Sequence, residues 1–253
     1  MTDAFLGVLI GLVAGILSGL FGVGGGIVMA PGIRILLGGD PLVAIATPLP
    51  AILPTALAGA VTYGRAREVD IRAAGWMIAA GLGGSVGGAT LTALVHPQLL
   101  LMAIAVLLGW QAIGVLRGRS SGRVSSRATG PIPYLAIGLV AGLLSGLLGI
   151  GGGLVMVPLL SGWLGVPLKR VLGTSLATIV ALVIPGTIVH AALGHIDWLI
   201  CLTLIIGGVP GASVGARIGL GARERTLRIL VGSFLLLVAA GYGARELVAL
   251  VRG

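Results

Sequence analysis

The sequence contains the same glycine-rich apolar segment twice, and this duplication constrains the fold more than any other feature. Residues 11–31 read GLVAGILSGLFGVGGGIVMAP and residues 138–158 read GLVAGLLSGLLGIGGGLVMVP, so 16 of 21 positions are identical. The offset between the two copies is 127 residues, and it aligns later positions without a gap. It pairs Thr47 with Thr174, Leu49 with Leu176, Gly59 with Gly186, Asp70 with Asp197, and Gly81, Gly84 and Gly88 with Gly208, Gly211 and Gly215. Such a register predicts two homologous halves.

Composition places both halves in a membrane. Hydrophobic residues make up 57% of the 253 residues and charged residues only 9%, whereas a soluble domain of this size needs more charged surface. Several apolar runs are long enough to cross a bilayer as helices. We predict an all-α polytopic membrane protein whose halves, residues 1–116 and 132–253, are joined by a cytoplasmic linker at 117–131. The expected apolar segments are 5–37, 42–63, 73–94, 98–116, 132–164, 168–192, 197–216 and 226–250.

The basic residues predict how the two halves are oriented. If segments 5–37 and 132–164 each cross the membrane once, the two sides carry nine and seven basic residues, and neither side is preferred. If each segment instead turns back at its glycines, only Arg34, Arg245 and Arg252 remain on one side. The other side then collects Arg65, Arg67, Arg72, Arg117, Arg119, Arg123, Arg127, Lys169, Arg170, Arg217, Arg223, Arg225 and Arg228. Because cytoplasmic loops are enriched in Lys and Arg, we predict an inverted repeat with both termini periplasmic. Each half then holds a glycine-broken hairpin and about three transmembrane helices.

Two kinds of glycine pattern have different predicted roles. Glycines spaced by four residues, at 7, 11, 15 and 19 and again at 138, 142 and 146, are typical of closely packed membrane helices. The triplets Gly24, Gly25, Gly26 and Gly151, Gly152, Gly153 permit a turn within the bilayer. The backbone N–H groups at the start of the following helix could then bind an anion. The alternative is a tight hairpin that contacts no ligand.

Several hydroxyl side chains are further candidates for substrate contacts. Thr47 lies beside Pro48, Pro50 and Pro54, and its counterparts are Thr174 and Ser175, so we expect a distorted helix at both places. These hydroxyls could bind substrate or cap freed carbonyl groups. Ser18 and Ser145 stand within the repeated segment and could be ligands or helix-packing residues.

The ionisable residues mainly exclude functions. The carboxylates lie in predicted loops or near segment ends, so no acidic proton relay is expected. His190 and Arg217 are candidates for a gate or pathway, with a structural hydrogen bond and an interfacial anchor as the alternatives. The glycine triplets lack the Lys-Ser/Thr ending of a phosphate loop. One cysteine and no ligand cluster predict neither a cofactor nor a metal.

The motifs together resemble the sulfite exporter TauE/SafE family. The resemblance rests on the doubled GLxSGLxGxGGGxVMxP motif, on ATP at 46–48 matched by GTS at 173–175, and on GxPGAxxGA at 208–216. It covers nearly the whole chain and implies a bacterial inner-membrane permease for small sulfur-containing anions. The first half departs from the pattern, because ATPLP replaces the GTS type.

The residues and the resemblance therefore predict a permease for a small anion such as sulfite or a sulfonate, working by alternating access at the repeat interface. An intramembrane hydrolase with Ser145 as nucleophile and His190 or His195 as base is the alternative from another class, and a transporter of an unrelated solute is a third. The expected partners are the anion and membrane lipid, not nucleic acid, because the net charge of +9 is distributed over short loops. A homodimer is left open.

Overall fold

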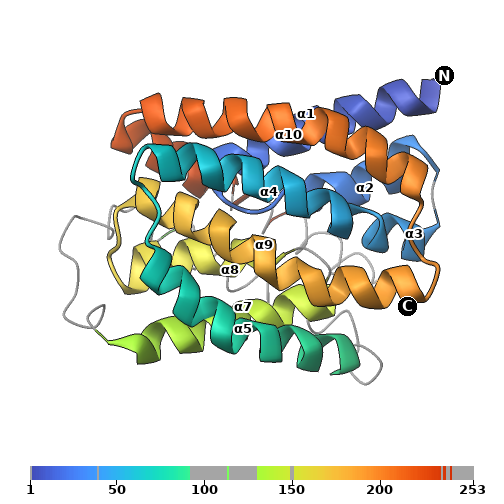
Figure 1. Cartoon of the computed structure of the whole chain (residues 1–253). Helices are drawn as coiled ribbons and strands as arrows, with labels where there is room; N and C mark the ends of the chain where they lie inside the picture. The colour runs from blue at the N-terminus through green and yellow to red at the C-terminus, as the bar shows by residue number, and fades with distance from the viewer. Residues whose placement is uncertain are drawn as a thin grey trace.

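In the computed structural model, residues 2–38, 40–91, 130–148 and 151–234 are described, with the single positions 113, 236, 237 and 240. All regular elements in these ranges are helical, which confirms the predicted all-α class (Figure 1). They are α1 (Thr2–Phe21), α2 (Gly26–Leu36), α3 (Pro41–Ala46), α4 (Pro48–Arg65), α5 (Ile71–Leu91), α7 (Pro131–Leu148), α8 (Gly153–Pro158), the π-helix η2 (Leu159–Trp163), α9 (Leu168–Ala192), α10 (Trp198–Gly221), and a helical stretch at 224–234. The predicted segment 98–116 apart from residue 113, most of the linker and most of the end of segment 226–250 lie outside the described residues.

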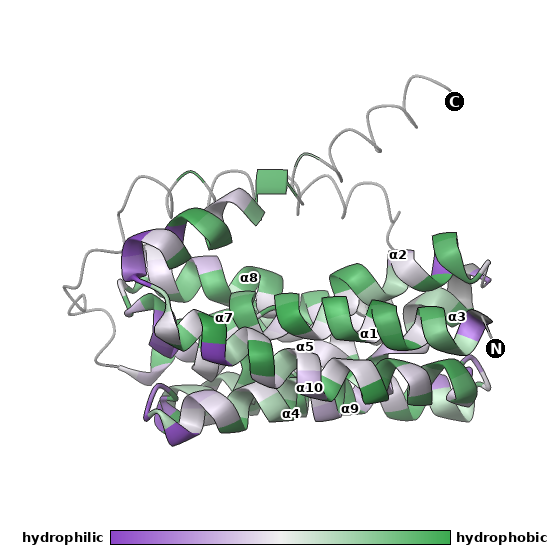
Figure 2. Cartoon of the chain, turned by 90° about the horizontal axis from the view of Figure 1, so that it is seen from above, coloured by the Kyte–Doolittle hydropathy of each residue, from purple (hydrophilic) through white to green (hydrophobic). Residues whose placement is uncertain are grey.

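The helices form a bundle with hydrophobic sides. Three helical stretches, Asp3–Phe21, Leu168–Ala192 and Trp198–Gly221, are long and apolar enough to cross a bilayer. Figure 2 shows hydrophilic residues at the two ends of the bundle and hydrophobic residues between them. Large apolar side chains such as Leu139, Ile188 and Ile206 are exposed on the helix surfaces, as expected for lipid-facing positions.

The predicted glycine stripes mediate the tightest helix contacts. α1 packs along α10, where Gly11 faces the carbonyl of Leu204. α7 packs along α5, where Gly138 faces the carbonyl of Met77. At these positions the space for a Cβ is occupied by backbone of the neighbouring helix, so glycine is required for the approach.

These contacts obey the repeat register found in the sequence. Helices α1, α4 and α5 correspond to α7, α9 and α10, and the first helix of each half packs on a helix of the other half. Contacts occur in reciprocal pairs: Gly59 lies against Leu176, and Gly186 lies against Leu49. Figure 1 shows that α1 and α7 start at opposite ends of the bundle, as do α4 and α9.

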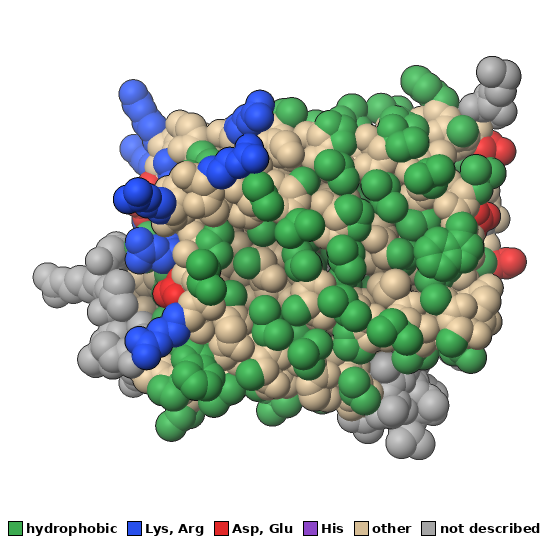
Figure 3. Space-filling model, in the orientation of Figure 1, with side chains coloured by type: hydrophobic (Ala, Val, Ile, Leu, Met, Phe, Trp, Pro, Cys, Tyr) green, Lys and Arg blue, Asp and Glu red, His purple; other side chains and the backbone are tan. Residues whose placement is uncertain are grey.

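Basic side chains gather at one end of the bundle, which we call the basic end. In Figure 3 the Lys and Arg side chains on the visible face lie at this end, whereas acidic side chains lie at both ends. The helix ends and loops located there carry Arg65, Arg67, Arg72, Lys169, Arg170, Arg217, Arg223, Arg225 and Arg228, whereas Arg34 lies at the C-terminal end of α2.

We expect Gly15→Ala to destabilise the protein by about 2 kcal/mol, because the added Cβ would lie 2.9 Å from the backbone nitrogen of Ala212 and would clash with the Gly208 carbonyl. Gly83→Ala is the matched control, since a Cβ there meets nothing within 4 Å and alanine favours the helix. Thermal unfolding in detergent measures both. Equal midpoints for the two variants would contradict the packing described here.

Candidate functional site

The first glycine triplet breaks the helix as predicted. α1 ends at Phe21 and α2 begins at Gly26, with Gly22, Gly24 and Gly25 at φ 69°, 92° and 78°. These left-handed angles are accessible to glycine at little cost. α2 then returns along α1, and Gly32 packs against Ile10.

The second triplet forms a matching turn. Gly151 and Gly152 have φ 86° and 70°, and a helical segment runs from Gly153 to Trp163 through α8 and η2. Gly152 packs on the carbonyl of Ala141 as Gly25 packs on that of Ala14, and these residues are equivalent in the repeat. Both predicted chain breaks are therefore present. α1 is nevertheless not the short piece expected, because Thr2–Phe21 is long enough to cross a bilayer.

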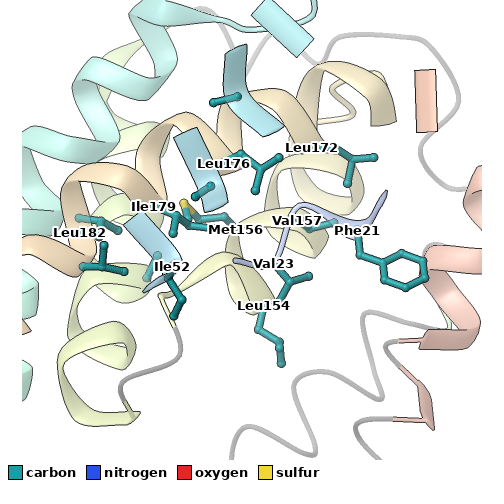
Figure 4. Close-up of a cluster of buried hydrophobic side chains, with 14 of the residues drawn as sticks. Phe21, Val23, Ile52, Leu154, Met156, Val157, Leu172, Leu176, Ile179 and Leu182 are labelled. Atoms are coloured by element: carbon teal, nitrogen blue, oxygen red, sulfur yellow. The ribbon is translucent and has the colours of Figure 1, made fainter. Parts of the chain in front are cut away.

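The two turns meet in the interior. A Cβ added at Gly153 would lie 2.7 Å from the carbonyl oxygen of Gly22 and 2.8 Å from the Cα of Val23. Gly24 and Gly151 both lie against Ile52 of α4 and Ile179 of α9, which are themselves equivalent in the repeat. Figure 4 shows these isoleucines in a cluster of buried apolar side chains around the turns.

Several backbone N–H groups of the turns have no acceptor in the part of the chain that the structure describes. The Gly25 carbonyl accepts from Val28 and Met29 at 3.0 and 3.1 Å, but the N–H groups of residues 24–27 find no acceptor among the described residues. In the second turn the Gly152 carbonyl accepts from Val155 and Met156, and the N–H groups of 151–154 are likewise unpaired within the described ranges. Since buried N–H groups are almost always paired, both turns have unused capacity to bind an acceptor.

Ser18 adds a buried hydroxyl to the first turn. Its side chain is 1% exposed, and its Oγ has no hydrogen-bond partner among the described residues. A Cβ at Gly25 would lie 3.6 Å from the Ser18 Cβ, so the serine flanks the N-terminus of α2. Its repeat equivalent, Ser145, is 3% exposed. A buried hydroxyl without a partner costs about 1–3 kcal/mol, which a bound acceptor would offset.

Ser175 and the two threonines have protein partners. Ser175 donates to the Gly22 carbonyl at 2.8 Å and so ties α9 to the first turn. Thr174 accepts from the backbone N–H of Asp70 at 2.9 Å, and Thr47 accepts from that of Asp197 at 3.1 Å. All three side chains are buried.

The expected helix distortion occurs in only one half. The chain changes from α3 to α4 at Thr47, but α9 runs unbroken through Thr174 and Ser175, so that part of the prediction is wrong. The physical reason is that three prolines follow Thr47, whereas the first proline after Thr174 is Pro185, more than two turns further along α9.

His190 and Arg217 do not lie at the turns. They stand near the C-terminal ends of α9 and α10, which are opposite ends of the bundle in Figure 1. His190 Nδ1 lies 3.3 Å from His195 Nδ1, and the Arg217 side chain is exposed. No hydrogen bond joins Ser145 to either histidine within the described part of the chain, so the geometry offers no support to the hydrolase alternative.

Sequence reasoning missed two features of this region. Ile52 and Ile179 were not selected, although the repeat register pairs them. The hydrogen bonds between Thr47 and Asp197 and between Thr174 and Asp70 were also missed, although all four positions were recognised as matched. The register identifies equivalent residues, but it does not say which of them touch.

The fold and this interior define a multi-pass helical membrane protein in which two interrupted helices meet inside the bundle. Comparison with known proteins gives the family: the profile described as "Sulfite exporter TauE/SafE" matches residues 7–242. The chain belongs to the TauE/SafE family, a family of membrane transporters. No solved structure matches the chain significantly.

Curated relatives are similar over almost their whole length. The chain is 30% identical to the "Probable membrane transporter protein YunE" of Bacillus subtilis, covering 91% of this chain and 94% of the relative. It is 27% identical to a "Probable membrane transporter protein" of Xylella fastidiosa, with 90% of both chains covered. It is 25% identical to the "Probable membrane transporter protein MJ0441" of Methanocaldococcus jannaschii, covering 90% of this chain and 91% of the relative.

Two serine variants should differ in their effect on stability. We expect Ser175→Ala to destabilise the protein by about 1 kcal/mol, because it removes the hydrogen bond to the Gly22 carbonyl. Ser18→Ala should leave stability unchanged or raise it, because it removes an unpaired buried hydroxyl. Thermal unfolding of the two purified variants measures the difference. Equal destabilisation by Ser18→Ala would show that its hydroxyl is already satisfied.

Proposed function

We propose that the chain is a permease that moves a small oxyanion across the membrane by alternating access at the interface of its halves. The observation that carries this proposal is the meeting of two buried glycine turns whose N–H groups lack acceptors among the described residues, beside the unpaired Ser18 hydroxyl. An anion with several oxygens can accept from many such donors at once.

The donor set favours an anion over a cation or a sugar. The glycine N–H groups begin helices, where the helix dipole also favours negative charge. Among the described residues, the carboxylates Asp3, Asp40, Glu68, Asp70, Asp197 and Glu224 all lie in loops or at helix starts, away from the turns. Sulfite or a sulfonate suits this chemistry, and the family's description as a sulfite exporter supports a sulfur oxyanion.

The proposed site residues follow from this arrangement. Gly24, Gly25 and Gly26 with Ser18 form one side, and Gly151, Gly152 and Gly153 with Ser145 form the other. Ser175 holds the first turn in place through the Gly22 carbonyl. Thr47 and Thr174 contribute away from the turns, at the loops that they bind.

We further propose that the halves, residues 1–116 and 132–253, form an inverted repeat joined by the linker at 117–131. Equivalent helices that start at opposite ends of the bundle support the inversion. Reciprocal contacts, such as Gly59 with Leu176 and Gly186 with Leu49, support a two-fold relation between the halves. A substrate at such an interface is equally close to both membrane faces.

The charge distribution suggests the orientation in the inner membrane. The basic end, with nine basic residues against Arg34 elsewhere in the described part, is assigned to the cytoplasm by the positive-inside rule. α1 starts at the other end, so the N-terminus is assigned to the periplasm. With the cell interior negative, export of a monovalent anion gains about 2.3 kcal/mol per 100 mV, so export needs no coupled proton.

The test is flux into proteoliposomes from a panel of sulfite, methanesulfonate, sulfate, phosphate and acetate under an imposed potential. We expect saturable flux of a sulfur oxyanion that rises when the destination compartment is positive. Ser18→Ala should reduce this flux about tenfold, because the anion loses one charge-assisted hydrogen bond. Gly25→Val should abolish it, because Gly25 has φ 78° and its N–H is proposed to face the anion.

Ser213→Ala is the matched control, since the Ser213 hydroxyl bonds locally to the Val209 carbonyl within α10. Its flux should equal that of the unmodified protein. Panel fluxes no greater than those of empty liposomes, or full flux in both Ser18→Ala and Gly25→Val, would refute the proposal.

A further inference from the structure

We propose that two matched hydrogen bonds between the halves are latches that close the two sides of the site and open in turn. The basic-end latch joins the Asp70 N–H to Thr174 Oγ1 at 2.9 Å, and the far-end latch joins the Asp197 N–H to Thr47 Oγ1 at 3.1 Å. The inference rests on the proposed permease function and concerns how access to its site is controlled.

Each latch connects the first half to the second in a reciprocal way. Asp70 and Thr47 belong to the first half, and their repeat equivalents Asp197 and Thr174 belong to the second. The loop of one half therefore binds the start of the central helix of the other half, at both ends of the bundle. Motion that separates a loop from its threonine breaks the bond at that end of the bundle.

The two loops that carry the donors are built alike. In the α4–α5 loop, the Glu68 N–H donates to the Tyr63 carbonyl at 3.0 Å, and Arg67 has φ 59°. In the α9–α10 loop, the His195 N–H donates to the His190 carbonyl at 3.1 Å, and Gly194 has φ 70°.

Each aspartate also holds the helix that follows it. Asp70 Oδ1 accepts from the N–H of Ala73, and Asp197 Oδ1 accepts from those of Leu199 and Ile200. Each loop is thus held rigidly to the helix that follows it, and we expect it to move as one body with α5 or α10.

The latches lie on the two sides of the proposed site. Thr47 precedes Ile52 by five residues in the chain, and Thr174 precedes Ile179 by the same number. Ile52 and Ile179 contact both glycine turns, and α4 and α9 start at opposite ends of the bundle. A tilt of α4 against α9 about this central contact separates one loop from its threonine while the other pair stays joined. With both bonds formed, the structure corresponds in this proposal to the state in which both latches are shut.

This arrangement explains why the threonines serve as latches and not as direct ligands. Each Oγ1 accepts from the N–H of a loop of the other half, away from the glycine turns, so its contact joins the halves. A single buried hydrogen bond is a suitable latch, since its loss shifts a two-state equilibrium by roughly fivefold without unfolding the chain.

The test measures access to the interior without any substrate. Cys201 is the single cysteine, so Cys201→Ala gives a background into which Ser18→Cys is introduced as an interior reporter. A membrane-impermeant thiol reagent is then applied to right-side-out and inverted vesicles. A separate Arg225→Cys variant in the same background identifies which vesicle face presents the basic end, where this exposed residue lies.

We expect Thr174→Val to raise reporter labelling from the basic-end face roughly fivefold and Thr47→Val to raise it similarly from the other face. Thr178→Val and Thr55→Val are the matched controls on α9 and α4. Both hydroxyls are fully buried but bond within their own helices, to the carbonyls of Thr174 and Ala51. These controls should leave labelling from both faces unchanged.

Unchanged labelling in both latch variants, a rise from the same face in both, or equal effects in the controls would overturn the latch assignment. Because labelling requires no transport, the assignment and the permease proposal can fail separately. If the latch variants change the face from which the reporter is labelled but no anion flux is found, the latch assignment stands and the proposed substrate is wrong. If anion flux is found but labelling from each face is unchanged, the permease proposal stands and the latch assignment is wrong.

Discussion

Direct contact between the backbones of helices from different halves is the constraint on which the rest of this structure depends. Hydrophobic burial gives little drive for association inside a bilayer, where lipid is as apolar as leucine, so close packing must supply it. Glycines on α1 and α7 provide this packing against α10 and α5. Once these helices are exchanged between the halves, the two glycine turns are brought together between α4 and α9.

The turns create a polar interior from nearly apolar residues. Their N–H groups and the Ser18 hydroxyl are surrounded by side chains such as Ile52, Ile179 and Met156. A few backbone donors in an apolar setting interact strongly with charge, because the local dielectric is low. The same setting makes the unpaired groups costly, and a bound acceptor would offset that cost.

Much of this architecture could be predicted from sequence, because apolar length, glycine spacing and repeat register are local or periodic signals. The break at Gly22–Gly26 and the packing role of the stripe through Gly11 and Gly15 are confirmed. Contacts between distant residues could not be predicted: nothing local places the Asp70 N–H beside Thr174 or the Ser175 hydroxyl beside the Gly22 carbonyl. The continuity of α9 was not predicted, because the distortion expected at Thr47 was also assumed for its equivalent Thr174. The prolines that follow Thr47 have no counterpart directly after Thr174.

The exchange of helices also determines when the chain can begin to fold. α1 is synthesised first, but its glycine-bearing face packs on α10, which begins only at Trp198, long after the first half is complete. Until then this face must contact lipid or the insertion machinery, and α5 must likewise wait for α7. The halves therefore cannot fold one after the other as separate domains do. The helices of the first half find their packing partners only when the second half has been synthesised. A nascent chain stopped before α10 lacks a closed interior.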